Sequence, residues 1–179
     1  EVADARPAFD SEREEIDETI EIDEGPRSMV ADVVLVGFEG VAPMPTPSTQ
    51  VGQPLDPEKR DADVKALVAA VSRGGYPEAR VESEIESVRT GSSVEATVVF
   101  RAEPGPHREI GQVVVENNLI TKDRVILREL PFETGSPYDP QALIDGQTSV
   151  HRLGLFRRVT VRPLDDANKE GPAPVAVRV

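Results

Sequence analysis

Apolar and polar side chains alternate along several short stretches of the chain, which is the pattern of a β-strand with one covered face and one wet face. Ile16, Ile20 and Ile22 alternate with acidic and polar residues, and the same alternation recurs from Val94 to Phe100. Other stretches are denser in valine and predict strands that are better buried. The strands predicted after residue 26 cover residues 30–38, 80–88, 94–101, 110–117, 157–162 and 174–179.

Segments with the periodicity of a helix lie between these predicted strands. Val64, Leu67, Val68 and Val71 recur at the spacing of one helix face, which predicts an amphipathic helix over residues 57–73. An Asp-Pro pair begins this segment and a Gly-Gly pair ends it, as expected for the two ends of a helix.

Two more helices are predicted later in the chain, at residues 121–130 and 140–153. Thr121 is placed to cap the first of them, and Pro131 to stop it. The corresponding place in the earlier half, residues 41–55, is rich in proline and is predicted to be irregular instead of helical.

The same order of elements occurs twice, and each copy follows a Gly-Pro pair at residues 25–26 or 105–106. The predicted fold class is therefore α+β, with tandem β-α-α-β-β modules, each a three-stranded mixed sheet covered by helices on one face. Residues 27–105 and 106–179 form the two predicted modules. Residues 1–26 supply only the final hairpin of a preceding copy.

Charge and composition narrow the classes of partner. The chain has 33 acidic and 20 basic residues, a net charge of −13, and most of the acidic excess precedes Pro26. This balance argues against binding to nucleic acid or to anionic lipid. The chain has no cysteine, which excludes disulfides and thiol chemistry. Because it begins at Glu1 without a signal peptide, we expect a processed or excised piece of a larger protein.

Residues that could carry catalysis or bind a metal are scarce. His107 and His151 are the two histidines, and neither has further ligands at metal-site spacing. The sequence has no nucleophile elbow, phosphate-binding loop or dinucleotide-binding glycine pattern. The acidic stretch at residues 12–24 lacks the layout of a calcium loop and is interpreted as a strand with a solvated face. We therefore predict no enzyme activity, no metal and no cofactor.

Several short motifs resemble the POTRA family, the polypeptide-transport-associated or surface-antigen repeats of BamA-type outer-membrane protein assembly factors. GSPYDPQAL is similar to the family's approach to its second helix, and Gly154-Leu155-Phe156 to its exit into the second strand. The earlier copy carries the variant Gly75-Tyr76-Pro77 at that exit, and EGP and PGP resemble the joints between successive repeats. Residues 41–55 depart from the family pattern.

These motif residues have structural roles in the prediction. A glycine with positive φ suits the turn from helix to strand, and an aromatic ring fills the space between sheet and helices. The motif residues are Gly75, Tyr76, Tyr138, Gly154, Leu155 and Phe156. The predicted rigid hinges between modules are Gly25, Pro26, Gly105 and Pro106.

The resemblance implies a periplasmic scaffold that holds unfolded outer-membrane proteins or assembly lipoproteins by adding their strands to its sheet edges. It further implies attachment to a C-terminal outer-membrane β-barrel in the full-length protein, with no nucleic-acid or small-molecule partner. The predicted edge residues are Arg80, Val81, Glu82, Ile85, Arg157, Arg158, Val159, Thr160, Val161 and Arg162.

Two alternatives remain open at this stage. The same modules could belong to a two-partner secretion transporter or a cell-division protein, which the rest of the gene would distinguish. An α+β ligand-binding or enzymatic domain would instead require a deep pocket lined by convergent polar groups.

Overall fold

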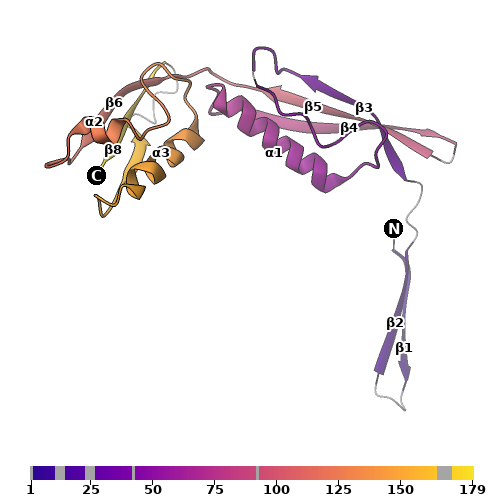
Figure 1. Ribbon diagram of the computed structural model, residues 1–179. Coiled ribbons are helices and arrows are strands. Elements are labelled where there is room, and N and C mark those ends of the chain that lie inside the picture. The colour runs from indigo at the N-terminus through magenta and orange to yellow at the C-terminus, as the bar shows by residue number, and fades with distance from the viewer. Residues whose placement is uncertain (1, 11–14, 23–26, 42, 92, 165–170) are drawn as a thin grey trace.

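The computed structural model describes residues 2–10, 15–22, 27–41, 43–91, 93–164 and 171–179. From residue 27 onward these residues form two successive modules, each with its own three-stranded sheet, with one helix beside the first sheet and two beside the second (Figure 1). The predicted α+β class is therefore confirmed. No helix in the described part of the chain is long and apolar enough to cross a membrane.

The sheet of the first module consists of β3 (Ser28–Val36), β4 (Arg80–Thr90) and β5 (Ser93–Glu103). Its strand order is β3-β5-β4, and β5 runs parallel to β3 and antiparallel to β4. The last strand of the module is thus the central one, and β3 and β4 are both edge strands. The three predicted strands are confirmed, with small shifts at their ends.

Helix α1 (Pro57–Arg73) covers one face of this sheet. The Asp56 side chain caps it by accepting hydrogen bonds from the backbone N–H groups of Glu58 at 2.9 Å and Lys59 at 3.4 Å. Proline at the first helical position loses no bond, because that N–H has no partner inside a helix. The predicted beginning and end of this helix are therefore confirmed.

The core of the first module lies between α1 and the central strand. Val98 and Phe100 of β5 are fully buried against Leu67 and Val71 of α1, and Val30 of β3 completes the cluster. Alternation on β5 and helical spacing on α1 place these residues on facing surfaces, so the two sequence patterns account for one shared core.

The proline-rich segment before α1 is irregular, as predicted. The buried carboxylate of one residue on α1 holds it through hydrogen bonds. Asp63 accepts hydrogen bonds from the Ser48 backbone N–H at 2.7 Å, the Ser48 hydroxyl at 2.8 Å and the Thr49 backbone N–H at 2.8 Å. Burial alone would raise the pKa of Asp63, but the contacts from Thr49 and Ser48 outweigh it and leave the pKa below 3.8. A hydrogen-bonded anion thus replaces helical packing as the support for this segment.

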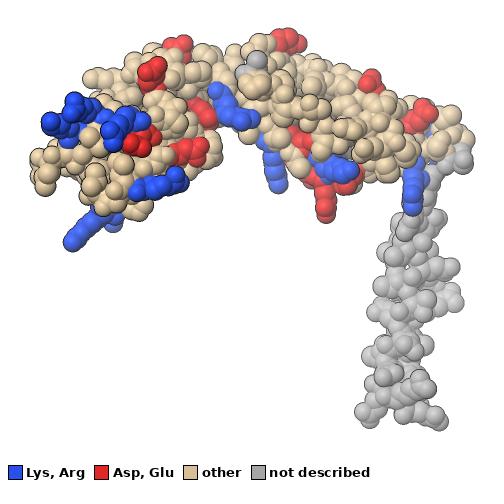
Figure 2. All heavy atoms as spheres, viewed as in Figure 1, with Lys and Arg blue, Asp and Glu red and all other residues tan. Residues whose placement is uncertain are grey.

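The second module repeats the sheet in a smaller form. Its strands are β6 (Ile110–Glu116), β7 (Thr160–Pro163) and β8 (Ala173–Arg178), in the order β6-β8-β7. β8 is central, parallel to β6 and antiparallel to β7. Its helices are α2 (Asp123–Leu127) and α3 (Pro140–Arg152). Figure 2 shows Lys and Arg side chains gathering over the part of this module where Figure 1 labels α2.

The first helix of this module is shorter than predicted, and the predicted cap at Thr121 is wrong. The cap position is Lys122, whose side chain makes no capping bond, and the helix ends at Leu127. Asn118 organises the preceding loop instead: its side-chain oxygen accepts from the Thr121 backbone N–H at 3.0 Å, and its amide donates to Asp123 at 2.6 Å. Thr121 is held by this loop and therefore does not cap the helix.

The strand predicted at residues 157–162 begins three residues later, at Thr160. After α3 the chain turns at Gly154, and its backbone pairs with β8 only from Thr160 onward. Val159 precedes this pairing and is buried against Ile126 and Val150. Its apolar side chain therefore fits the alternating pattern, although its backbone is not part of the strand.

The predicted N-terminal hairpin is present as backbone. β1 (Val2–Asp10) pairs antiparallel with β2 (Glu15–Ile22), with Phe9 opposite Ile16. The predicted hinge residues Gly25 and Pro26 lie outside the described residues, as do the side chains of the predicted acidic strand face.

Candidate functional site

An open groove runs between helix α1 and the edge strand β4 of the first module. Its volume is about 540 Å³. It is lined by Asp61, Val64 and Lys65 from the helix and by Val81, Glu82 and Ser83 from the strand. Among the described residues β4 pairs only with β5, so alternate backbone N–H and C=O groups along its outer side have no strand there to pair with.

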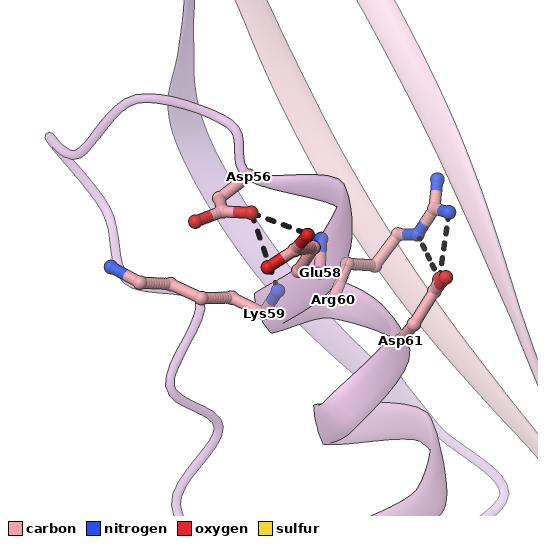
Figure 3. Close-up of polar contacts among 5 residues, drawn as sticks. All are labelled: Asp56, Glu58, Lys59, Arg60 and Asp61. Atoms are coloured by element: carbon pink, nitrogen blue, oxygen red, sulfur yellow. Dashed lines mark hydrogen bonds and ion pairs between the residues drawn. The ribbon is translucent and has the colours of Figure 1, made fainter.

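The groove has an apolar floor and a charged rim. Val81 is buried at its base and Val64 is half-buried beside it, whereas Lys65 and Glu82 are exposed. On the helix side of the rim, the Arg60 guanidinium lies 2.8 Å from the Asp61 carboxylate (Figure 3). Apolar side chains of a bound segment would meet the floor, and its polar side chains would remain in water.

The predicted edge residues of the first module all lie on this strand. Val81 and Ile85 share the face toward α1, because their partners on β5 are the buried Ala102 and Val98. Ile85 lies farther along β4, where its side chain is 38% exposed. The structure thus brings a length of unpaired edge together with exposed apolar surface.

Sequence reasoning did not include the helix side of the groove. The signal was present, since Val64 belongs to the predicted apolar stripe of residues 57–73. Which end of that stripe lies over the sheet edge depends on how α1 crosses the sheet, which periodicity alone does not define.

The corresponding edge in the second module is short and partly blocked. Strand β7 spans only Thr160–Pro163, and its proline has no N–H to donate. The backbone N–H of Val161 already donates to the Gln147 side-chain oxygen of α3, at 3.2 Å. The predicted edge residues Arg157, Arg158 and Val159 precede the strand. The second predicted edge is therefore shorter than the first and has fewer backbone groups free to pair with a bound strand.

Replacing Gln147 with alanine should free this edge. We expect a loss of about 1 kcal/mol in the free energy of unfolding, because the Val161 N–H loses its acceptor. The Val161 amide should also exchange with solvent faster in hydrogen-exchange NMR. Gln141→Ala is the matched control, because that side chain bonds to Asp145 within the same helix; equal exchange at Val161 in both variants would contradict the assignment.

The two modules meet at a joint around the predicted hinge residues Gly105 and Pro106. The Arg108 backbone N–H donates to the Gly75 carbonyl at 2.7 Å. The rings of Tyr76 and His107 pack edge to face, with centroids 5.1 Å apart. The end of α1 is thus bonded directly to the first residues of the second module.

Arg108 connects this joint to the rest of the second module. Its side chain is buried, and its guanidinium lies 5.4 Å from the centre of the Tyr138 ring. The Tyr138 backbone N–H donates to the Arg108 carbonyl at 3.0 Å. Sequence reasoning gave His107 an ordinary surface role and did not single out Arg108, because neither residue belongs to a recognisable motif.

The predicted structural motif residues have different outcomes. Tyr138 is buried, while Tyr76 and Phe156 are half-buried and pack on the cores of their modules. Gly75 and Gly154 both have positive φ, +93° and +70°, as the turn from helix to strand requires. Leu155, by contrast, is 60% exposed and does not belong to the core.

His107 lies at the joint against Tyr76, and His151 lies on helix α3. Within the part of the chain that the structure describes, no group of three or more His, Cys, Asp or Glu side chains is arranged to hold a metal ion. The features that stand out are an open strand edge beside a groove and a bonded joint between modules. From residue 27 onward, the described part of the chain is therefore built of serial α+β modules.

Comparisons with known proteins agree with this class. Residues 109–179 match the sequence model of POTRA, described as the surface antigen variable number repeat. No curated protein sequence matches the chain significantly. The match to the POTRA family therefore covers the second module.

Two solved structures show the same fold. The chain is similar to POTRA3-5 of BamA from Haemophilus influenzae, at 19% identity and a TM-score of 0.53, over 100% of this chain and 71% of that one. It is also similar to BamA from Haemophilus ducreyi lacking POTRA domains 1-3, at 16% identity and a TM-score of 0.58. That match covers 73% of this chain and 24% of the BamA chain.

Proposed function

We propose that this chain is part of the periplasmic arm of a BamA-type outer-membrane assembly factor and holds client polypeptides in extended form. The observation that carries the proposal is the unpaired edge of β4 beside the groove formed with α1. The clients are unfolded outer-membrane proteins, and assembly lipoproteins can dock by the same backbone contacts. The likeness to BamA POTRA domains supports the proposed periplasmic location.

The chemistry of the edge suits clients of varied sequence. Backbone N–H and C=O groups are the same in every client, so strand addition recognises an extended backbone more than a particular sequence. Segments of outer-membrane strands alternate apolar and polar side chains. Their apolar side chains would meet Val81 and Val64 on the groove floor, while the polar ones would face water.

The proposed organisation follows the repeat. We assign residues 27–105 and 106–179 to two successive POTRA modules, and the β1–β2 hairpin within residues 1–26 to the end of a preceding module. In this assignment the first module supplies the client-binding edge. The second supplies a rigid continuation, held by the joint at Arg108 and Gly75.

The direct test is NMR titration of the full chain with a peptide taken from an outer-membrane strand. Strand addition should shift the backbone amides of β4 and the side chains that line the groove. Shifts confined to the residues of α3, or no shift at saturating peptide, would contradict this function.

The variant Ile85→Lys should weaken peptide binding about tenfold, because a charged side chain on an edge strand disfavours the addition of another strand. Ile85 is partly exposed, so the module should still fold. Ile144→Lys, at a 58% exposed position on α3, introduces the same charge away from the groove and should leave binding unchanged. Equal affinity of the two variants, measured by fluorescence anisotropy, would place the peptide elsewhere.

A further inference from the structure

One face of strand β4 carries three glutamates at alternate positions. Glu82, Glu84 and Glu86 are all exposed, and we call them the acidic row. Successive residues of a strand point to opposite faces of the sheet, and Val81 and Ile85 already share the face toward α1. The acidic row therefore lies on the opposite, solvent face, along the same open edge.

The sheet offers little positive charge to offset the acidic row. The Arg101 guanidinium lies 3.9 Å from the Glu84 carboxylate, and the two side chains are 50% and 58% exposed. In the described part of the chain, neither of the other two glutamates pairs with a cation. Arg80, on the same face at the start of β4, lies opposite Glu103. The edge therefore keeps most of the negative charge of the row.

The position of Arg101 also limits its effect on a bound segment. Arg101 belongs to the central strand β5, and β4 lies between it and any strand added at the edge. Neighbouring strands are about 4.8 Å apart, so the added strand would lie two such spacings from Arg101 and one from the acidic row. A bound segment would therefore meet the glutamates before the arginine.

A strand added at this edge would place its side chains directly beside those of β4. Directly opposed residues have Cβ atoms about 4.5–5.5 Å apart, where opposite charges favour pairing and like charges oppose it. On the face toward α1 the added strand would meet Val81, Ser83 and Ile85, which carry no charge. On the other face it would meet the acidic row. The two faces of the edge therefore favour different side chains.

We propose that the β4 edge selects extended segments in which apolar side chains alternate with lysine or arginine. The apolar side chains enter the groove beside α1, and the basic ones lie along the acidic row. A shift of one residue would turn the basic side chains toward the apolar groove floor, so the row also fixes the register of the bound segment. This inference rests on the proposed client binding at β4 and names the class of client.

Three peptides of one design test the selection. All have the same apolar side chains at alternate positions, and the positions between them carry lysine, threonine or glutamate. Fluorescence anisotropy with the full chain at low ionic strength should rank their affinities in that order, with about tenfold between the first and the last. The difference should shrink at about 0.5 M salt, because exposed charges are screened.

A triple variant separates the acidic row from the overall negative charge of the chain. With Glu82→Gln, Glu84→Gln and Glu86→Gln combined, the lysine and glutamate peptides should bind with equal affinity. The matched control removes the same charge from the second module and should keep the tenfold preference. Its substitutions are Glu129→Gln, Glu133→Gln and Asp145→Asn.

The outcomes distinguish this inference from the proposed function. If the threonine peptide does not bind, or binds without shifting the backbone amides of β4, strand addition at β4 is wrong and the charge selection falls with it. If that peptide binds at β4 but the lysine and glutamate peptides have equal affinity, the charge selection alone is overturned. A lysine preference that survives in the triple variant also overturns it, because the net charge of −13 would then be the cause.

Discussion

Replacing Gly75 with alanine is expected to lower the free energy of unfolding by about 2–3 kcal/mol and to change the angle between the two modules. The residue has φ of +93°, which an L side chain rarely adopts. Its Cβ would also lie within 2.9 Å of both His107 and the Arg108 carbonyl. Relief requires the joint to open, which breaks the bond between the Arg108 N–H and the Gly75 carbonyl.

The matched control is Gly154→Ala, at the equivalent turn of the second module. That glycine has φ of +70° and open space around it, so alanine should cost only the backbone strain of about 1 kcal/mol. Thermal unfolding compares the stabilities, and small-angle X-ray scattering compares the shapes in solution. If the two variants lose equal stability and keep the same scattering profile, the packing at Gly75 does not hold the joint.

Replacing Asp63 with alanine is expected to cost about 3 kcal/mol. The buried N–H of Thr49 and the N–H and hydroxyl of Ser48 would lose their common acceptor. The proline-rich segment should then detach from α1, which limited proteolysis would detect as new cleavage between residues 41 and 55. Asp61→Ala is the control, because that side chain is 62% exposed and pairs with the neighbouring Arg60 at the surface.

The same carboxylate gives stability a defined pH dependence. The pKa of Asp63 is below 3.8 in the folded chain, so its contribution is complete above about pH 4 and is lost as the pH falls through the folded pKa. Asp63→Asn should remove this part of the acid transition, with the decline in stability below pH 4 becoming shallower. An unchanged slope in urea titrations between pH 5 and pH 2.5 would mean that other carboxylates control the transition.

Some local structure could be read from the sequence because each pattern depends on near neighbours. The cap at Asp56 and the stripe ending at Val71 define α1 without knowledge of the rest of the chain. Local rules failed where a side chain had two possible partners. Thr121 could have capped a helix, but the Asn118 side chain holds it in a loop. Val159 fits the alternating pattern of a strand, but it packs in the core beside the strand and is not part of it.

The candidate site shows the same division. The repeated order of elements predicted β4, and the resemblance to a repeat family implied that its edge binds a partner. Gln147 bonds to Val161 across 14 residues, and this contact decided that the second edge is partly closed. A glutamine on a helix carries no sequence signal for such a bond, because its acceptor reaches a strand only after the two elements have packed.

The amino-acid sequence alone determined the order of helices and strands, the repetition of that order and the positions where the chain turns, since these follow from residues close together in the chain. The tertiary structure alone decided which edge stays open, that Asp63 holds the proline-rich segment, and that Gly75 is packed where Gly154 is open. Those features depend on distances between residues far apart in the sequence, and only the packed modules define such distances.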